Sequence, residues 1–462
     1  MPLQRREFLK HIMAASVAGS SLGLGGTALS AFGADTSGYK ALVCVFLFGG
    51  LDNHDFLLPY DASDYQQFAQ LRQTLLATQG ASRARESLQP LSPVNAQSGD
   101  SRWALPPEMP MLKGLFDSGE ANLVANVGPL IEPVTRQSFF DESARLPPRL
   151  FSHNDQQATW QASAPEGAQF GWGGLFADAV TGGISSSDAL AFSTISSAGG
   201  GPFLTGRIAF PYQINPGGAA EVFLLEEFND FPGGVSSALR THLQGGNYLD
   251  SHIIRRDMQS AHTNAFSAND SYNAAKSGAA PLTTAFPETE LGSQLRAVAE
   301  TIAIRDMLGV SRQVFFVGMG GFDTHSAQAT ALPQLLGQID GAVGAFNTAM
   351  KELAVNEQVT LFSASEFGRT LAVNGDGTDH GWGGHQFVVG GAVSGGQLLG
   401  AVPPPLYDHD LDSGGGRLIP QYAVEQFAHP LGRWFGLTDA EVRDALPALS
   451  NFNDPGWQMF RS

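Results

Sequence analysis

The amino-acid sequence contains several long apolar runs, and each run ends in glycine or in a polar cluster. The first two are ALVCVFLFGGLD (residues 41–52) and ANLVANVG (residues 121–128). Three more follow in the C-terminal half: QVFFVGMGGFDTH, VTLFSASEFGRT and HQFVVGGAV, which begin at residues 313, 359 and 385. An uninterrupted apolar run of this length predicts a strand that is buried on both faces, as in parallel sheets.

Helical patterns lie between some of these runs. Apolar residues recur at three- and four-residue steps over residues 291–302 and again over residues 332–353, and Gly309 is expected to close the first helix. Strands that alternate with helices predict an α/β fold, in which a doubly wound, mostly parallel sheet carries helices on both faces.

Residues 192–287 interrupt this alternation with clusters of Gly, Ser and Asn such as SSAGGGPF. We expect them to form a loop-rich insertion that caps the sheet, within a single domain over residues 35–462. The polar stretch 74–101 is expected to be a surface loop.

The first 34 residues carry an export pattern. QRREFLK (residues 4–10) places Arg5 and Arg6 before a run of small and mildly apolar residues that reaches residue 32. This is the pattern of a twin-arginine signal peptide, with cleavage near Gly33 or Ala34. It predicts a periplasmic or secreted protein that the twin-arginine translocase exports, with no transmembrane segment in the mature chain.

Charge and cysteine content narrow the function classes. A net charge of −18 speaks against a nucleic-acid or anionic-membrane partner, since such binding depends on clustered Lys and Arg. The single cysteine, Cys44, excludes an intramolecular disulfide and is predicted to be a core residue.

Acids and histidines follow the apolar runs. In an open α/β sheet, ligands bind beyond the carboxyl ends of the strands, so these residues are expected to face one crevice. They are Asp52, Asp55, Asp323, His325, Glu366, Asp379, His380 and His385. Carboxylates and imidazoles together suit one or two divalent transition-metal ions, zinc or manganese, better than calcium or magnesium.

Each of these residues also has a structural interpretation. Asp323 could accept turn hydrogen bonds, Glu366 could stabilise a helix N-terminus, and Asp379 and His380 could belong to a solvated glycine loop. His385 could either bind the metal or support a ligand.

Catalytic candidates come from two further segments. FSHNDQQATWQ places Ser152 at a predicted helix start, where free N–H groups favour phosphate or sulfate; the alternative is an ordinary N-cap. His153 would donate a proton to the leaving group or orient a ligand. Arg369 would clamp a tetrahedral anion or form a salt bridge.

Several segments together resemble the bacterial "domain of unknown function 1501" family. They are GGLDNHDFLLPYD, FSHNDQQATWQ, RQVFFVGMGGFDTH, SEFGRTLAVNGDGTDHGWGGHQFVVGGAVSGG and GRLIPQYAVEQFAHPLGRWFGL. That family is usually placed in the alkaline phosphatase and sulfatase superfamily. The resemblance implies cleavage of phosphate or sulfate esters with one or two divalent metals and a Ser, Thr or formylglycine nucleophile.

The same resemblance assigns roles to individual positions. Asp52 resembles the first-strand metal ligand and Ser152 the nucleophile, while the other matching metal positions are Asp323, His325, Glu366 and His380. The sequence departs from alkaline phosphatases in two places. Asp323 and His325 are two residues apart rather than four, and Glu366-Phe367 stands where those enzymes have Asp-His. Asp379-His380 is expected to supply the missing imidazole.

The predicted function is therefore an exported metal-dependent hydrolase of a small anionic ester or of a sulfated or phosphorylated glycan. The alternative is a non-catalytic cell-envelope protein that binds a glycan or a protein partner in the same crevice. A third interpretation is a polysaccharide-modifying enzyme whose two carboxylates are Asp52 and Glu366.

Overall fold

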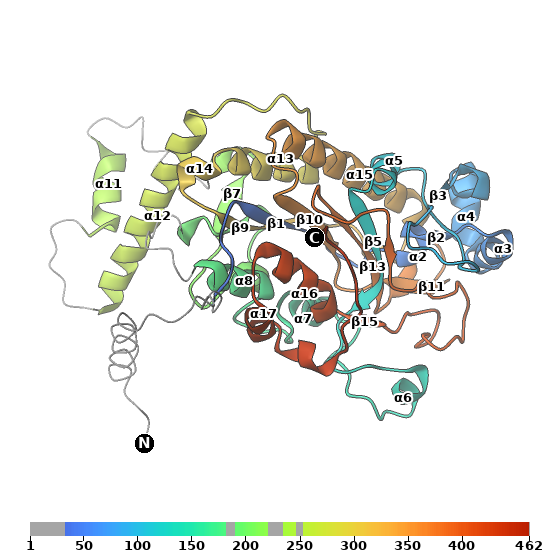
Figure 1. Cartoon of the computed structure of the whole chain (residues 1–462). Helices are drawn as coiled ribbons and strands as arrows, with labels where there is room; N and C mark the ends of the chain where they lie inside the picture. Colours follow the sequence, from blue (N-terminus) through green and yellow to red (C-terminus); the bar gives the residue numbers. More distant parts are fainter. Residues whose placement is uncertain (1–32, 182–189, 220–233, 246–252, 462) are drawn as a thin grey trace, which may run out of the picture. The chain divides into compact units, whose positions relative to one another are not determined.

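A mostly parallel sheet forms the centre of the computed structural model, which describes residues 33–181, 190–219, 234–245 and 253–461 (Figure 1). The central strand β1 (Lys40–Leu47) pairs in parallel with β9 (Arg312–Met319) and β10 (Val359–Ala364). The strand order is β14-β5-β13-β10-β1-β9-β6-β7-β8, with β15 beside β5. The strand β13 (Gly384–Val389) runs antiparallel to β10 and to β5 (Ala121–Gly128).

Helices cover both faces of this sheet. Alternate side chains of β1 point to opposite faces: Val43 and Val45 pack in one core, and Leu42 and Phe46 in the other. The first core includes side chains from α5 (Pro110–Asp117), α13 (Glu290–Ala303) and α15 (Gln328–Glu352). The second includes side chains from α7 (His153–Ala162), α8 (Trp172–Thr181), α16 (Val424–Phe435) and α17 (Asp439–Ala445). The predicted doubly wound α/β fold is confirmed.

The sequence patterns located these elements closely. Cys44 is buried in the second core, as predicted, and both helical patterns became helices. Gly309 differs slightly from its expected role. It closes α14 (Arg305–Leu308), a short helix that follows α13, and it adopts the left-handed φ of 68° that glycine tolerates.

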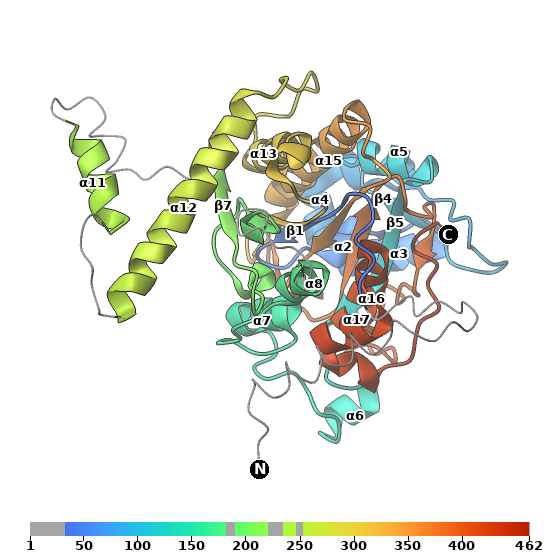
Figure 2. The same ribbon diagram turned by 60° about the vertical axis from the view of Figure 1, so that its left-hand side comes forward.

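Residues 192–287 contribute more to the sheet than their composition indicated. They supply β6 (Thr194–Ser196), β7 (Tyr212–Asn215) and β8 (Gly218–Ala219), which extend the sheet beyond β9. Beyond β7 lie α11 (Val235–Leu243) and α12 (Ile253–Ser277) (Figure 2). That this segment caps the sheet stays a prediction, because residues 220–233 and 246–252 lie outside the described part.

The stretch 74–101 is not simply a surface loop. It contains most of α4 (Gln73–Gln79), two short 3-10 turns and β3 (Gln89–Pro90), which pairs with β4 (Trp103–Leu105). Strand β4 also pairs with β2 (Leu58–Pro59). Within the stretch 74–101, Arg83 is fully buried and pairs with Asp55, one of the acids that follow β1.

The remaining elements are short. They are α2 (Asn53–Phe56), α3 (Ala62–Leu71), α6 (Arg136–Phe140), β11 (Arg369–Val373), β12 (Thr378–His380), β14 (Leu398–Leu399) and β15 (Tyr422–Ala423). None of the described helices is long and apolar enough to cross a membrane. The predicted signal peptide lies outside the described residues except for Gly33 and Ala34.

Candidate metal centre

The candidate site lies at the carboxyl ends of β9 and β10, where the sequence analysis predicts a ligand-binding crevice. Three separate elements supply its centre: His153 begins α7, Asp323 follows β9, and His380 ends β12. The antiparallel pairing of β11 with β12 sets Arg369 opposite His380, which brings the glycine-rich segment 377–385 over the site. The fold therefore gathers residues that lie more than two hundred positions apart in the chain.

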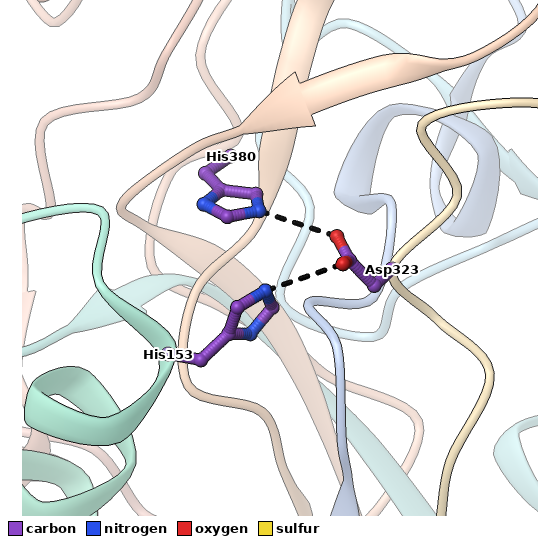
Figure 3. Close-up of side chains that lie close together, drawn as sticks. All are labelled: His153, Asp323 and His380. Atoms are coloured by element: carbon purple, nitrogen blue, oxygen red, sulfur yellow. Dashed lines mark hydrogen bonds and ion pairs between the residues drawn. The ribbon is translucent and has the colours of Figure 1, made fainter.

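His153, Asp323 and His380 point toward one another (Figure 3). Nε2 of His153 lies 3.4 Å from Oδ2 of Asp323, and Nε2 of His380 lies 3.2 Å from Oδ1 of the same carboxylate. One donor atom from each of the three residues lies within 4.8 Å of the other two. Two nitrogens and a carboxylate at this separation form a donor set that suits zinc or manganese.

The outer ring nitrogens of both histidines are held by acceptors. Nδ1 of His153 lies 2.8 Å from the Oε1 atom of Glu366, and Nδ1 of His380 lies 2.7 Å from the Phe151 carbonyl oxygen. A carboxylate and a carbonyl can only accept, so each Nδ1 carries the proton. When each imidazole is neutral, its unprotonated Nε2 faces Asp323. Metal-binding histidines are commonly oriented in this way, so the residues fit a metal ion.

The two histidines differ in how readily they accept a second proton. The hydrogen bond to Glu366 raises the pKa of His153, whereas burial lowers the pKa of His380. Burial would raise the pKa of Asp323, but the hydrogen bond and charge of Arg369 outweigh burial and hold it below its usual value. Asp323 is therefore an ionised carboxylate that faces two imidazoles.

His325 and Asp379 extend the cluster toward solvent. Nε2 of His325 lies 2.9 Å from Nε2 of His380 and 3.1 Å from Oδ1 of Asp323. Nδ1 of His325 lies 3.3 Å from Oδ1 of Asp379. Their side chains are 44% and 49% exposed, so they lie at the mouth of the site.

Glu366 lies behind His153 rather than beside Asp323. It is fully buried, and its Oε1 atom also accepts hydrogen bonds from the Gly49 N–H (2.8 Å) and the Gln157 side chain (2.9 Å). These contacts make Glu366 a support for His153 instead of a direct partner of Asp323. Its predicted role as a metal ligand stays a prediction.

Arg369 uses its donors within the protein. Its Nη1 donates to Oδ1 of Asp323 (2.7 Å) and to the Gly49 carbonyl (3.0 Å), and its Nη2 donates to the Thr378 carbonyl. The structure thus forms the salt bridge that was the alternative to an anion clamp.

Ser152 occupies the N-cap of α7, next to the cluster through His153. Its hydroxyl donates to Oδ2 of Asp155 at 2.9 Å, and Asp155 is buried. The position at a helix start is as predicted, but the hydroxyl contacts Asp155 and not a residue of the cluster. Its role as nucleophile stays a prediction.

Asp52 and His385 have other partners. Asp52 caps α2 and pairs with Arg72, while Nδ1 of the buried His385 accepts a hydrogen bond from the Asn126 N–H at 3.0 Å. Burial lowers the pKa of His385 to about 3, so it stays neutral. Among the contacts of the described residues, none joins Asp52 or His385 directly to the His153, Asp323 and His380 cluster.

The sequence interpretation missed two residues that surround this site. Arg72 lies between α3 and α4, and Gln328 begins α15; both are buried and both donate to Asp52. The spacing of Arg72 and Gln328 in the sequence does not indicate that they contact Asp52. Their roles become visible only when the structure shows which side chains surround that carboxylate.

Comparisons with known proteins agree with the family resemblance. The model of the family described as "Protein of unknown function (DUF1501)" matches residues 39–446. A search of curated proteins found no match.

Solved structures similar to this chain include Ps i-CgsB in complex with k-i-k-neocarrahexaose, with 9% identity and a TM-score of 0.36 over 90% of this chain and 78% of that chain. They also include the PsFucS1 sulfatase from Pseudoalteromonas sp., with 11% identity and a TM-score of 0.35 over 95% of this chain and 73% of that chain. At these TM-scores the likeness carries no conclusion about chemistry.

Proposed function

Because the chain belongs to the DUF1501 family of proteins of unknown function, its activity has to be inferred from its site, and we propose a hydrolase of phosphate or sulfate esters that uses a divalent metal ion. One observation carries this proposal. Two imidazoles are fixed by their Nδ1 protons so that both Nε2 atoms face the oxygens of Asp323.

His153, Asp323 and His380 would hold the ion, and zinc or manganese suits this donor set. A bound divalent ion would neutralise charge on an ester oxygen and lower the pKa of a nearby hydroxyl. The free N–H groups at the N-terminus of α7, a helix of 10 residues, would also stabilise the negative charge of the bound substrate.

Ser152 would be the nucleophile. Its Oγ atom would form a bond to the phosphorus or sulfur atom while its proton passes to Asp155, 2.9 Å away, and the bond to the leaving oxygen breaks. His325, whose side chain is 44% exposed at the mouth of the site, would give a proton to the leaving oxygen. A water oxygen would then form a bond to the phosphorus or sulfur atom, and the bond of that atom to Oγ would break. Asp155 would return its proton to Oγ, and the proton lost by the water would pass to His325.

We also propose that the protein is exported by the twin-arginine translocase, on the basis of Arg5 and Arg6. Its substrate would then be a small anionic ester or a sulfated or phosphorylated glycan outside the cytoplasm. Replacing both arginines with lysine is expected to retain the protein in the cytoplasm, which cell fractionation would measure. Unchanged export would contradict this route.

Elemental analysis of protein purified without chelators tests the metal. Asp323→Asn and His380→Ala are expected to lose the ion, while His429→Ala keeps it. His429 is a suitable control because it also lies near an acid, Asp439, at 3.3 Å, but on α16.

A substrate panel tests the chemistry. Aryl phosphate, phosphate diester and aryl sulfate would be assayed with metal-free protein and again after zinc or manganese is added. Turnover that depends on the metal supports the proposal. Bound metal without turnover of any of the three substrates would favour the non-catalytic binding protein.

A further inference from the structure

We propose that this site holds a single divalent ion, because a fixed arginine, Arg72, already occupies the Asp52 carboxylate that the family resemblance assigns to a metal. The inference rests on the proposed metal-dependent function. It concerns how many ions bind and what the buried Asp52 and Arg72 pair does instead.

The Asp52 carboxylate is saturated with donors. Its Oδ1 accepts the His54 N–H at 2.9 Å and Nη2 of Arg72 at 3.1 Å. Its Oδ2 accepts Nη1 of Arg72 and Nε2 of Gln328. Two carboxylate oxygens have about four lone-pair sites, and four N–H donors fill them. A metal ion would have to displace at least one of these donors.

Moving Arg72 away from Asp52 would cost several hydrogen bonds and a buried ion pair. Besides the two-pronged contact with Asp52, its Nε donates to the Leu371 carbonyl at 3.2 Å and its Nη2 to the Thr370 carbonyl at 2.7 Å. Both partners of the ion pair are only 1% exposed. Separating a buried ion pair leaves an uncompensated charge in the interior, which strongly destabilises the fold. A metal ion beside the retained guanidinium would in turn meet a like charge.

Asp323 presents the opposite situation. Its side chain is 45% exposed, and its oxygens face the Nε2 atoms of His153 and His380, whose protons sit on the other ring nitrogen. When both imidazoles are neutral, the lone pairs of three residues meet here, and a bound cation would offset their repulsion. Asp323 also pairs with Arg369 through Oδ1, the oxygen that faces His380, but this contact leaves Oδ2 facing His153. The two carboxylates are thus neutralised differently: Asp52 by a guanidinium, and Asp323 by a guanidinium together with the metal.

The Asp52 and Arg72 pair is connected to the metal site through Gln328. The Oε1 atom of Gln328 accepts hydrogen bonds from the hydroxyls of Thr324 (3.0 Å) and Thr378 (2.6 Å). Thr324 adjoins Asp323, and the carbonyl of Thr378 accepts from Arg369. Asp52 and Arg72 therefore act as positioning residues that hold the loops carrying Asp323 and His380.

Zinc stoichiometry tests the inference without any activity assay. Protein would be saturated with zinc, freed of excess ion and analysed for zinc per chain. The wild type is expected to hold one. In the double variant Asp52→Asn, Arg72→Gln both side chains are uncharged and similar in shape to the originals. It therefore avoids the unpaired buried charge that either single change would leave. It is also expected to hold one zinc, with weaker affinity, whereas Asp323→Asn is expected to hold none.

The outcomes separate this inference from the proposed function. Two zinc ions in the wild type, with one lost in the double variant, would overturn the single-ion inference and leave metal dependence intact. No zinc in the wild type would overturn both. Circular dichroism of each variant would show that it is folded before zinc is counted, and His429→Ala serves as the control for unspecific zinc binding.

Discussion

Nδ1 of His153 donates to Oε1 of Glu366 over 2.8 Å, and this hydrogen bond decides which nitrogen of His153 faces Asp323. The same oxygen accepts two further hydrogen bonds, from the Gly49 N–H and from the Gln157 side chain. Glu366 comes from the end of β10 and His153 from the start of α7. The contact therefore ties the orientation of the ring that faces Asp323 to the central sheet.

Glu366→Gln is expected to weaken metal binding about 10- to 100-fold, because a neutral amide holds the His153 ring less firmly than a carboxylate does. A competition titration with a chromophoric chelator would measure the affinity. Glu425→Gln changes another buried glutamate, at the start of α16, and should leave the affinity as it is. An equal loss in both variants would point to a general effect on the fold.

Ser152→Ala is expected to reduce ester turnover by about three orders of magnitude or more, since it removes the proposed nucleophile. The loss of stability should be about 1 kcal/mol or less, because the hydroxyl caps no backbone N–H and bonds only Asp155 among its described partners. Steady-state kinetics and urea unfolding would measure the two effects.

Thr438→Ala is the matched control for this serine. Its hydroxyl caps α17 in a capping box with Glu441. We expect a stability loss of about 1 kcal/mol with turnover retained. If Ser152→Ala kept full turnover in metal-loaded protein, the nucleophile assignment would be wrong.

Asp340→Ala is expected to destabilise the fold by about 1–2 kcal/mol, because Asp340, a residue of α15, caps the N-terminus of the neighbouring helix α5. Its carboxylate accepts the N–H groups of Met111 (3.0 Å) and Leu112 (2.8 Å) in the first turn of α5. Asp340→Asn keeps an acceptor oxygen and should lose less. Urea unfolding of both variants checks this, and equal losses would show that packing, not capping, is what matters.

The architecture and the edge of the sheet were predictable from the sequence. Runs such as the one around Val43 are apolar at every position because both faces of β1 are covered, and that pattern is local. Asp323 and Glu366 follow β9 and β10, which pair in parallel with β1 on its two sides, so their positions at the carboxyl ends of these strands follow from topology. His380 was expected at the same place because its glycine-rich segment lies between SEFGRT and the next apolar run, and it reaches the site from the end of β12, in a separate two-stranded sheet.

The partners of each side chain were not predictable. Asp52 and Asp323 both follow apolar runs, yet Arg72 neutralises the first, and the second faces histidines. Which donor reaches a carboxylate depends on how α3 and α4 pack over β11, and no spacing in the sequence encodes that packing. For the same reason the contact of His153 with Asp323 was not predicted, and its role as a proton donor or as a residue that orients a ligand stays a prediction. The short strand β6 was also missed.

Acidification is expected to destabilise the metal-free protein through its buried histidines. Burial lowers the pKa of His54 to about 4 and that of His385 to about 3, both below the usual value of 6.5. Below pH 6.5 these two histidines bind protons in the unfolded chain but stay neutral in the folded protein. Each histidine therefore stabilises the fold above pH 6.5, and this contribution is lost as the pH falls, by about 1.4 kcal/mol per pH unit. Urea unfolding of chelator-treated protein between pH 6 and 5 would measure the slope, and His385→Gln should reduce it by that amount. A slope that His385→Gln leaves unchanged would show that this histidine binds its proton in the folded state as well.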